Sequence, residues 1–143
     1  MKTSPSDVNV DVRYQTIFII WMAILMTVVL YLVLIWMTPV PPNPEQASLA
    51  TVLSALSVVP VAISFFVKTR ILARAAETQN LPQVQQGYVT GFAMCEVAVL
   101  LGVLIHFVTG SPYRFIAIAI GAAGLLLHFP RKQHLLNATF KPL

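Results

Sequence analysis

The chain has 143 residues, of which 57% are hydrophobic and 10% are charged. Soluble domains average roughly 45–50% apolar and about 25% charged residues, so the composition predicts a membrane protein. The net charge of +4 does not indicate a nucleic-acid partner, because the positive residues border apolar runs instead of forming one basic surface. The single cysteine, Cys95, excludes an internal disulfide and every multi-cysteine metal framework.

Four apolar stretches have the character of transmembrane helices, and they lie at 17–37, 47–67, 88–108 and 113–129. A helix of about 20 residues, rising 1.5 Å per residue, crosses a hydrocarbon core of about 30 Å. The stretches are too long and too uniformly apolar for the alternating strands of a membrane barrel. The sequence therefore predicts an all-α integral membrane protein in which residues 1–143 form a single four-helix transmembrane domain.

The segments between these stretches are predicted to be loops. Prolines at four positions between 38 and 46 predict a stiff, extended connection after the first helix. Residues 68–87 are rich in Gln and Arg, and Pro82 disfavours a helix there, so we expect a polar loop. The sequence Thr-Gly-Ser-Pro at 109–112 predicts a tight turn between the last two helices, and Pro130 is expected to end the fourth.

Positive charge is divided unequally between the two sides of this predicted bundle. One side has both termini and the loop at 68–87, with eight basic residues: Lys2, Arg13, Lys68, Arg70, Arg74, Arg131, Lys132 and Lys141. The other side has Arg114. By the positive-inside rule, both termini are expected to face the cytoplasm, across a bacterial inner membrane or its equivalent. Arg131 and Lys132 are predicted to contact anionic lipid headgroups.

Small residues lie along one face of the predicted third helix. With each residue advancing about 100°, an arc of roughly 80° contains Gly87, Gly91, Cys95, Ala98 and Gly102. The fourth helix has Gly121 and Gly124. Helices associate in lipid through close backbone approach at small residues, because hydrophobic burial gives no driving force there. We expect the second, third and fourth helices to pack tightly. The bulky first helix is expected to be more peripheral, with Trp21 and Trp36 towards its ends in the headgroup layer.

Glu96 lies near the middle of the third helix, on a different face from the small residues. A carboxylate at this depth costs about 2.5–3.5 kcal/mol, so it is normally paired, protonated or functional. Two interpretations follow. Glu96 binds a proton or cation, or it is a neutral acid bonded to a hydroxyl or carbonyl group of a neighbouring helix or subunit.

The stretch Phe92-Ala93-Met94-Cys95-Glu96, with Gly102 six residues after the acid, resembles the carboxyl-bearing helix of the proteolipid c subunits of rotary ATP synthases and vacuolar ATPases. Ile71-Leu72-Ala73-Arg74 is similar to the entry of that family's polar loop. The resemblance covers residues 47–109. It implies a proton-binding carboxylate at Glu96, a loop role for Arg74 and a homo-oligomeric ring. The chain departs from the family in having Ala75-Ala76 where Gln-Pro is usual, and its acid in the third helix.

Two histidines could act as axial ligands of a haem or chlorophyll-type pigment. His106 is predicted near the outer end of the third helix and His128 near the inner end of the fourth, so the two cannot form a bis-histidine pair within one chain. The alternative for each is a hydrogen bond to loop backbone. The sequence has no nucleophile with an evident base, no phosphate-binding glycine loop and no His/Asp/Glu set for a metal. We expect neither an enzyme nor a metal site.

These features favour a small non-catalytic accessory or structural subunit of a larger membrane complex, of respiratory or photosynthetic type. One alternative is a c-like proteolipid that carries a proton or cation on Glu96 in a homo-oligomeric ring. Another is a self-associating membrane protein with an independent regulatory role. The expected partners are the lipid bilayer and other membrane subunits or copies of the same chain, with no nucleic acid.

Overall fold

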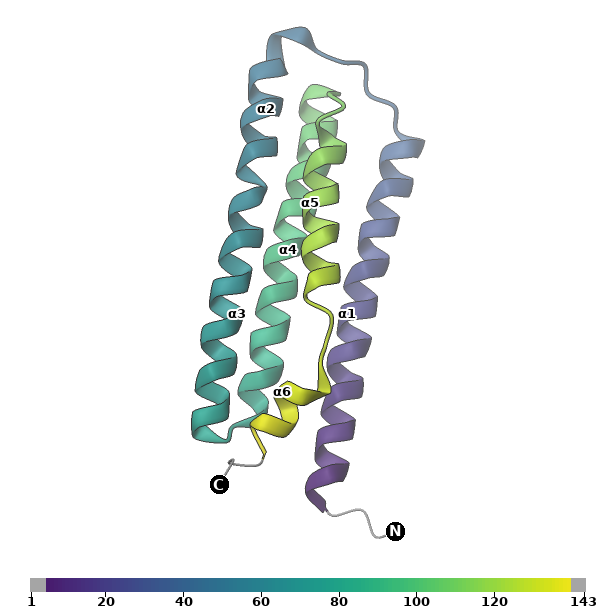
Figure 1. Cartoon of the computed structure of the whole chain (residues 1–143). Helices are drawn as coiled ribbons and strands as arrows, with labels where there is room; N and C mark the ends of the chain where they lie inside the picture. Colours follow the sequence, from purple (N-terminus) through teal and green to yellow (C-terminus); the bar gives the residue numbers. More distant parts are fainter. Residues whose placement is uncertain (1–4, 140–143) are drawn as a thin grey trace.

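A computed structural model of the chain describes the backbone of residues 5–139 and the side chains of residues 10–139 (Figure 1). The described part is helical and contains no strand. Its elements are α1 (Pro5–Met37), the short 3-10 helix η1 (Pro44–Gln46), α2 (Ala47–Leu56), α3 (Val58–Thr78), α4 (Leu81–Thr109), α5 (Arg114–Leu127) and α6 (Lys132–Asn137). The predicted all-helical class is confirmed.

Three helical segments are long and apolar enough to cross a membrane: Val10–Met37, Pro44–Thr78 and Leu81–Thr109. The fourth, α5, is a shorter apolar helix of 14 residues. After it the chain runs extended past Pro130 and then turns into α6 (Figure 1).

The prediction of a polar loop at 68–87 is wrong. α3 continues to Thr78 and α4 begins at Leu81, so the two helices form a hairpin joined by Gln79 and Asn80. Pro82 lies in the first turn of α4, where its missing N–H has no intrahelical partner to lose. The Asn80 side chain accepts a hydrogen bond from the backbone N–H of Gln83, which caps the new helix.

The predicted second helix is divided into α2 and α3 at Ser57. Pro60 lies four residues after Leu56 and cannot donate the backbone hydrogen bond that would continue the helix regularly. The Ser57 hydroxyl donates to the carbonyl of Ser54 at 2.6 Å, and its amide donates to Leu53 at 3.1 Å. The chain therefore continues in nearly the same direction across this break (Figure 1).

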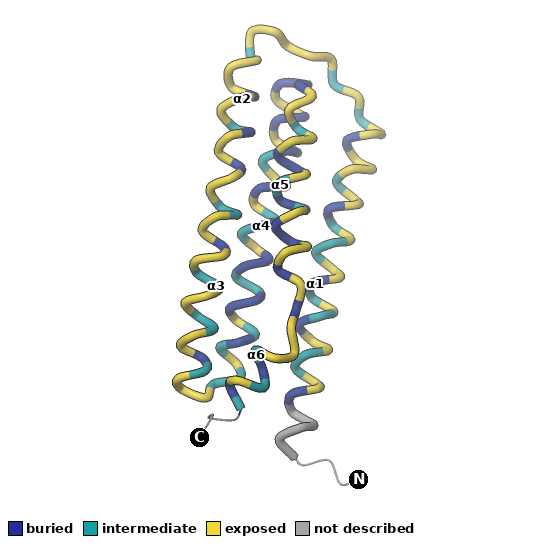
Figure 2. The backbone as a smooth tube through the Cα atoms, viewed as in Figure 1, coloured by how far each residue is buried: buried dark blue, intermediate teal, exposed yellow. Residues whose placement is uncertain are grey.

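The core of the bundle is α4, which is the most buried of the long helices, whereas α1 is the least buried (Figure 2). α1 contributes a narrow buried seam with spacings of seven and four residues: Val10, Ile17, Trp21, Val28 and Ile35. Such spacing keeps one face of a helix against its neighbour. The outward residues of α1 are exposed, including Trp36 at 81%.

Two ends of the bundle can be distinguished (Figure 1). The hairpin end contains the beginning of α1, the connection between α3 and α4, and α6. The proline end contains the segment 38–46 and the turn between α4 and α5. At the proline end, Gly110 has φ of 61°, and a Cβ there would lie 2.3 Å from the carbonyl oxygen of Pro41, so this position requires glycine.

Candidate functional site

Glu96 lies on the face of α4 that contacts α1, and it is partly buried. Its Oε1 atom is 3.2 Å from the hydroxyl oxygen of Thr27 on α1. The side chain of Tyr31, one turn further along α1, also interacts with this carboxyl group. The structure therefore places the acid beside hydroxyl groups of the chain's own first helix, away from the small-residue face of α4.

Small residues of α4 and α5 lie where these two helices approach most closely. A Cβ added at Gly102 would lie 2.8 Å from the carbonyl oxygen of Arg114, and one at Gly121 would lie 2.8 Å from that of Cys95. A Cβ added at Gly124 would lie 2.9 Å from the Cys95 sulfur atom. Because backbone atoms occupy the space at Gly102 and Gly121, the two helices can approach closely there only at residues this small.

The same stripe continues towards α3. A Cβ at Gly87 would lie 3.2 Å from a methyl carbon of Ile71, and one at Gly91 would lie 2.7 Å from the His128 ring. Ala98, which lies between Gly91 and Gly102 on α4, is fully buried. One face of α4 thus contacts α3 near the hairpin end and α5 towards the proline end.

His128 is fully buried at the end of α5. Its Nδ1 atom lies 2.8 Å from the carbonyl oxygen of Gly124, and its Nε2 atom lies 3.3 Å from the hydroxyl of Ser64 on α3. The Phe65 ring packs against it with centroids 4.3 Å apart. Both ring nitrogens are therefore engaged by protein groups, and the residue joins α5 to α3.

His106 occupies a comparable position at the proline end, where it is 1% exposed. Its Nε2 atom lies 2.7 Å from the carbonyl oxygen of Thr38, just after α1. Its Nδ1 atom and the Nε atom of Arg114 have no hydrogen-bond partner among the residues that the structure describes. Both residues line a cavity of about 420 Å³ between the ends of α1 and α5, together with Trp36.

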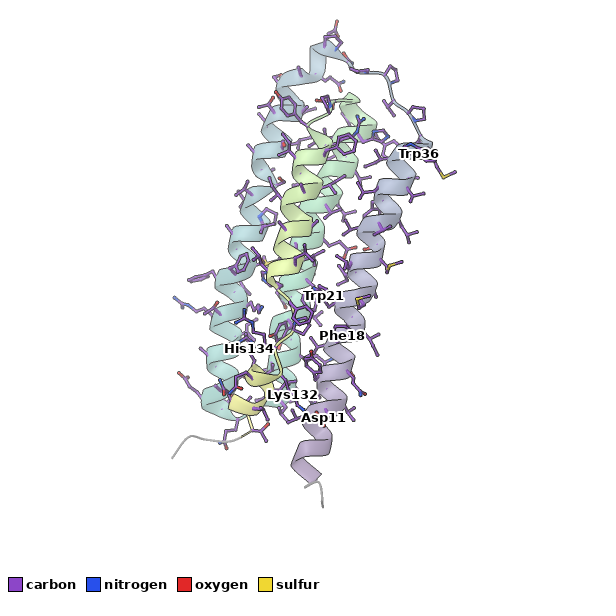
Figure 3. The ribbon with its side chains drawn as sticks, turned by 45° about the vertical axis from the view of Figure 1, so that its right-hand side comes forward. Asp11, Phe18, Trp21, Trp36, Lys132 and His134 are labelled. Atoms are coloured by element: carbon purple, nitrogen blue, oxygen red, sulfur yellow. The ribbon has the colours of Figure 1, made fainter. Side chains whose placement is uncertain are left out.

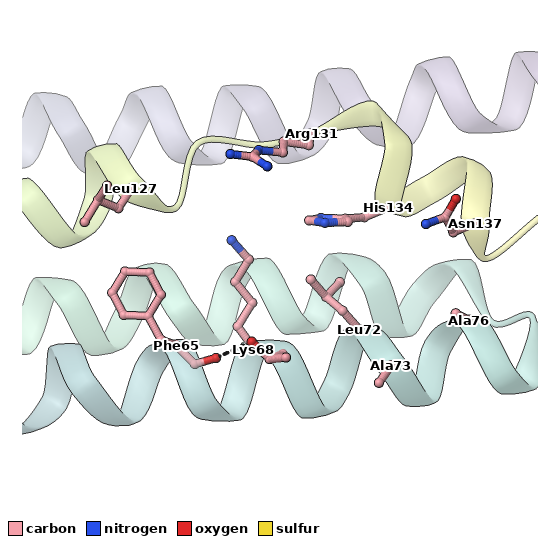
Figure 4. Close-up of a pocket in the computed structure, with 10 residues that line it drawn as sticks. Phe65, Lys68, Leu72, Ala73, Ala76, Leu127, Arg131, His134 and Asn137 are labelled. Atoms are coloured by element: carbon pink, nitrogen blue, oxygen red, sulfur yellow. Dashed lines mark hydrogen bonds between the residues drawn. The ribbon is translucent and has the colours of Figure 1, made fainter.

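A second cavity, of about 450 Å³, lies at the hairpin end between the α3–α4 hairpin and the C-terminal segment (Figure 4). It is lined by Phe65, Lys68, Thr69, Leu72, Ala73, Ala76, Leu127, Arg131, His134 and Asn137. We call it the basic pocket. Figure 4 shows the nitrogen-bearing ends of Lys68, Arg131 and His134 gathered in the space between the hairpin and the segment that follows α5.

Tyr88 of α4 contacts all three basic residues of this pocket. Its hydroxyl accepts a hydrogen bond from the backbone N–H of Arg131 at 2.9 Å and lies 2.6 Å from Nδ1 of His134. The Lys68 ammonium lies 4.5 Å from the centre of the Tyr88 ring, within the range of a cation–π interaction. One side chain thus positions all three basic residues.

Of the two residues predicted to contact lipid headgroups, Arg131 lines the basic pocket, whereas Lys132 forms an ion pair with Asp11 of α1 (Figure 3). Lys68 also lines the pocket, which the sequence alone did not indicate. The predicted loop at 68–87 concealed Lys68, because only a continuous α3 places Lys68 and Leu72 on one helix face.

Among the described residues, no group of three or more His, Cys, Asp or Glu side chains is placed to hold a metal ion. The buried Cys95 sulfur lies 3.6 Å from the Ser64 hydroxyl and 4.0 Å from Nδ1 of His128, within the helix contacts described above. No protein-family model matches the chain, and neither a curated protein nor a solved structure shows significant similarity to it.

Proposed function

We propose that this protein is a small non-catalytic subunit of a larger membrane complex, in which it crosses the bilayer four times with both termini on the cytoplasmic side. One observation carries the proposal: several buried polar side chains join helices of the chain to one another. His106 bonds to the backbone after α1, His128 joins α5 to α3, and Trp21 joins α1 to α5. Side chains used in this way maintain a scaffold.

A fourth crossing is supported by the way the end of α5 is bonded. At 1.5 Å per residue, 14 residues span about 21 Å, which is less than the hydrocarbon core. The extended segment after α5 would complete the crossing, which requires partners for its backbone polar groups. Trp21 donates to the carbonyl of Leu125 in the last turn of α5, and the Tyr88 hydroxyl accepts from the amide of Arg131 in the segment after it, so both parts have a bonded backbone group.

The orientation is supported by the distribution of charge between the two ends. Arg13, Lys68 and Arg131 belong to the hairpin end, and Arg114 belongs to the proline end. Lys2 and Lys141, which the sequence also assigns to the positive side, lie outside the described residues. The positive-inside rule then gives a cytoplasmic hairpin end.

The topology can be tested with cysteine labelling, since Cys95 is buried and is the only cysteine in the chain. In a Cys95→Ser background, a membrane-impermeant thiol reagent added outside intact cells should label Val40→Cys at the proline end. It should label Gln79→Cys at the hairpin end only after the cells are opened. The opposite pattern would reverse the orientation, and labelling of both from outside would exclude four crossings.

The subunit role can be tested by native mass spectrometry of the protein extracted gently from its own membrane. One or two copies among larger subunits are the expected result. Cysteine crosslinking then locates the contact, by comparing Leu30→Cys on the exposed face of α1 with Phe66→Cys on the exposed face of α3. A monomer that crosslinks to nothing from either face would contradict the proposal.

The second candidate is a c-like proteolipid, and the hydrogen bonding of Thr27 is compatible with it. The Thr27 hydroxyl has one proton and two neighbours, the carbonyl oxygen of Ile24 at 2.7 Å and Oε1 of Glu96 at 3.2 Å. A carbonyl can only accept, so the proton is best directed to Ile24. A protonated Glu96 would then donate to Thr27, as a proton carrier would in its loaded state.

Glu96→Gln separates the two candidates. A proton carrier should lose proton transport while its assembly stays intact, and a carbodiimide that modifies protonated carboxyl groups should label wild type but not this variant. In a scaffold, the amide should preserve assembly and function because it can still bond to Thr27, whereas Glu96→Leu should weaken assembly. Many identical copies in native mass spectrometry, together with loss of transport in Glu96→Gln, would overturn the accessory role.

A further inference from the structure

We propose that the basic pocket binds the phosphate group of an anionic membrane lipid, with Lys68, Arg131 and His134 as its ligands. This binding site is independent of whether the chain acts as an accessory subunit or as a proteolipid.

Charge is the first argument. The basic pocket contains a lysine, an arginine and a histidine, and none of its ten lining residues is acidic. Within the described part of the chain, the one ion pair joins Lys132 to Asp11, so Lys68, Arg131 and His134 form none there. Like charges held together without a counterion repel one another, and a bound anion would remove that repulsion.

The hydrogen-bond inventory is the second argument. The Tyr88 hydroxyl accepts from the amide of Arg131 and has one proton of its own, which it can donate to Nδ1 of His134 when that nitrogen is unprotonated. The neutral His134 ring then has its proton on Nε2, which is a donor. Lys68 and Arg131 are also donors. The pocket thus offers donors from three directions, which suits the acceptor oxygens of a phosphate group.

The shape and position of the pocket favour a lipid over a soluble anion. Phe65, Leu72 and Leu127 line it beside the basic groups, and Phe65 and Leu127 are exposed on the outside of the bundle. These residues lie on apolar helices that could span the membrane or accompany a span. A phosphate held by the basic groups would leave room for acyl chains along this apolar surface, at the level where headgroups occur.

The test uses the full chain in phosphatidylcholine vesicles with and without phosphatidylglycerol, and measures lipid retained after detergent extraction by native mass spectrometry. Wild type should retain phosphatidylglycerol. Arg131→Gln should lower the apparent affinity on the order of tenfold, as expected for loss of a charge-assisted hydrogen bond. Arg74→Gln removes the same charge from an exposed position on α3 outside the pocket and should leave the affinity unchanged.

Other outcomes overturn the proposal. Equal retention by wild type, Arg131→Gln and Arg74→Gln would show that the pocket is not the site, and equal losses in both variants would show attraction by net charge alone. If sodium phosphate without anionic lipid raises the melting temperature of wild type but not of Arg131→Gln, the site belongs to a soluble anion. Arg131 is exposed, so Arg131→Gln should fold, and Lys68→Arg, which keeps the charge, should retain most of the lipid binding.

Discussion

The indole Nε1 atom of Trp21 donates a hydrogen bond to the backbone carbonyl oxygen of Leu125 at a distance of 2.8 Å. The Leu125 carbonyl lies in the last turn of α5 and also accepts from the backbone amide of His128 at 3.2 Å, so the indole is its second donor. Trp21 is 6% exposed and packs edge-to-face on Phe129, with ring centroids 5.1 Å apart. Trp21 therefore faces the interior of the bundle and not the surrounding lipid (Figure 3).

Trp21→Phe should lower the free energy of unfolding by about 0.5–1.5 kcal/mol, because the Leu125 carbonyl loses the indole donor and keeps only the His128 amide at 3.2 Å. The measurement is reversible unfolding in detergent or bicelles. Trp36→Phe is the matched control, since Trp36 is 81% exposed, and its effect should stay within about 0.5 kcal/mol. Equal effects of the two changes would mean that the hydrogen bond contributes nothing to stability.

Gly121→Ala should destabilise the bundle by about 1–3 kcal/mol, because the added methyl group would lie 2.5 Å from Val99 and 2.8 Å from the carbonyl oxygen of Cys95. The sign of the change in the free energy of unfolding distinguishes two effects. By intrinsic helix propensity alone, the same change should stabilise α5 by about 1 kcal/mol. Ala119→Val adds bulk on an exposed face of α5 and serves as the control, with little expected change. A more stable Gly121→Ala protein would refute the close contact between α4 and α5.

Gln79→Gly should stabilise the protein by about 0.5–1 kcal/mol. Gln79 ends α3 with φ of 51° and ψ of 45°, a left-handed conformation that glycine adopts without the steric cost of a Cβ. Gln86→Gly, in the exposed part of α4, should instead destabilise by about 1 kcal/mol. The two melting temperatures should therefore move in opposite directions. A decrease for both would argue against the tight hairpin between α3 and α4.

The stability of the protein should fall as the pH is lowered through the ordinary titration range of histidine, and His134 should account for part of this fall. Burial, followed by the nearby charges of Lys68 and Arg131, lowers the pKa of His134 below its usual value. The groups that face it are Lys68 from α3, Tyr88 from α4 and Arg131 before α6. The unfolded chain takes up the proton at about pH 6.5 while the folded chain resists it, so acid favours unfolding.

Unfolding measured from pH 8 to pH 5 should show a smaller loss of stability in His134→Gln than in wild type. The difference between the two proteins isolates His134 from other titrating groups. Phosphatidylglycerol should reduce this loss in wild type, because a bound anion favours the protonated ring. Identical pH profiles for the two proteins would show that His134 does not contribute to the loss of stability in acid.

Pro82 shows why the loop at 68–87 could not be excluded from sequence patterns. A proline disfavours the interior of a helix but is well tolerated in its first turn, and the two cases differ only in where the helix begins. Asn80, two residues earlier, is a frequent helix cap and was the available signal for a start at this point. The charged residues of 68–78 are compatible with a helix that leaves the hydrocarbon layer.

The seam of α1 could not be identified from sequence for a different reason. In water, the buried face of a helix differs from the exposed face because one is apolar and the other polar. In α1 the outward residues Ile19 and Leu30 are as apolar as the inward Ile17 and Val28, although their exposed fractions are 66%, 62%, 1% and 4%. A helix whose exposed side suits lipid has no such contrast.

The sequence by itself determined the all-helical membrane class, because long uncharged runs have few other stable structures where water cannot satisfy the backbone. It also identified the small residues of α4 and α5 and the carboxylate at Glu96, because these residue types are unusual in such helices and have few roles there. Only the tertiary structure decided which residues meet. Lys68 and Tyr88 are far from Arg131 and His134 in the chain, and their common pocket depends on the hairpin and on the extended segment after α5. Contacts between distant residues depend on how whole helices pack, and no local pattern records that packing.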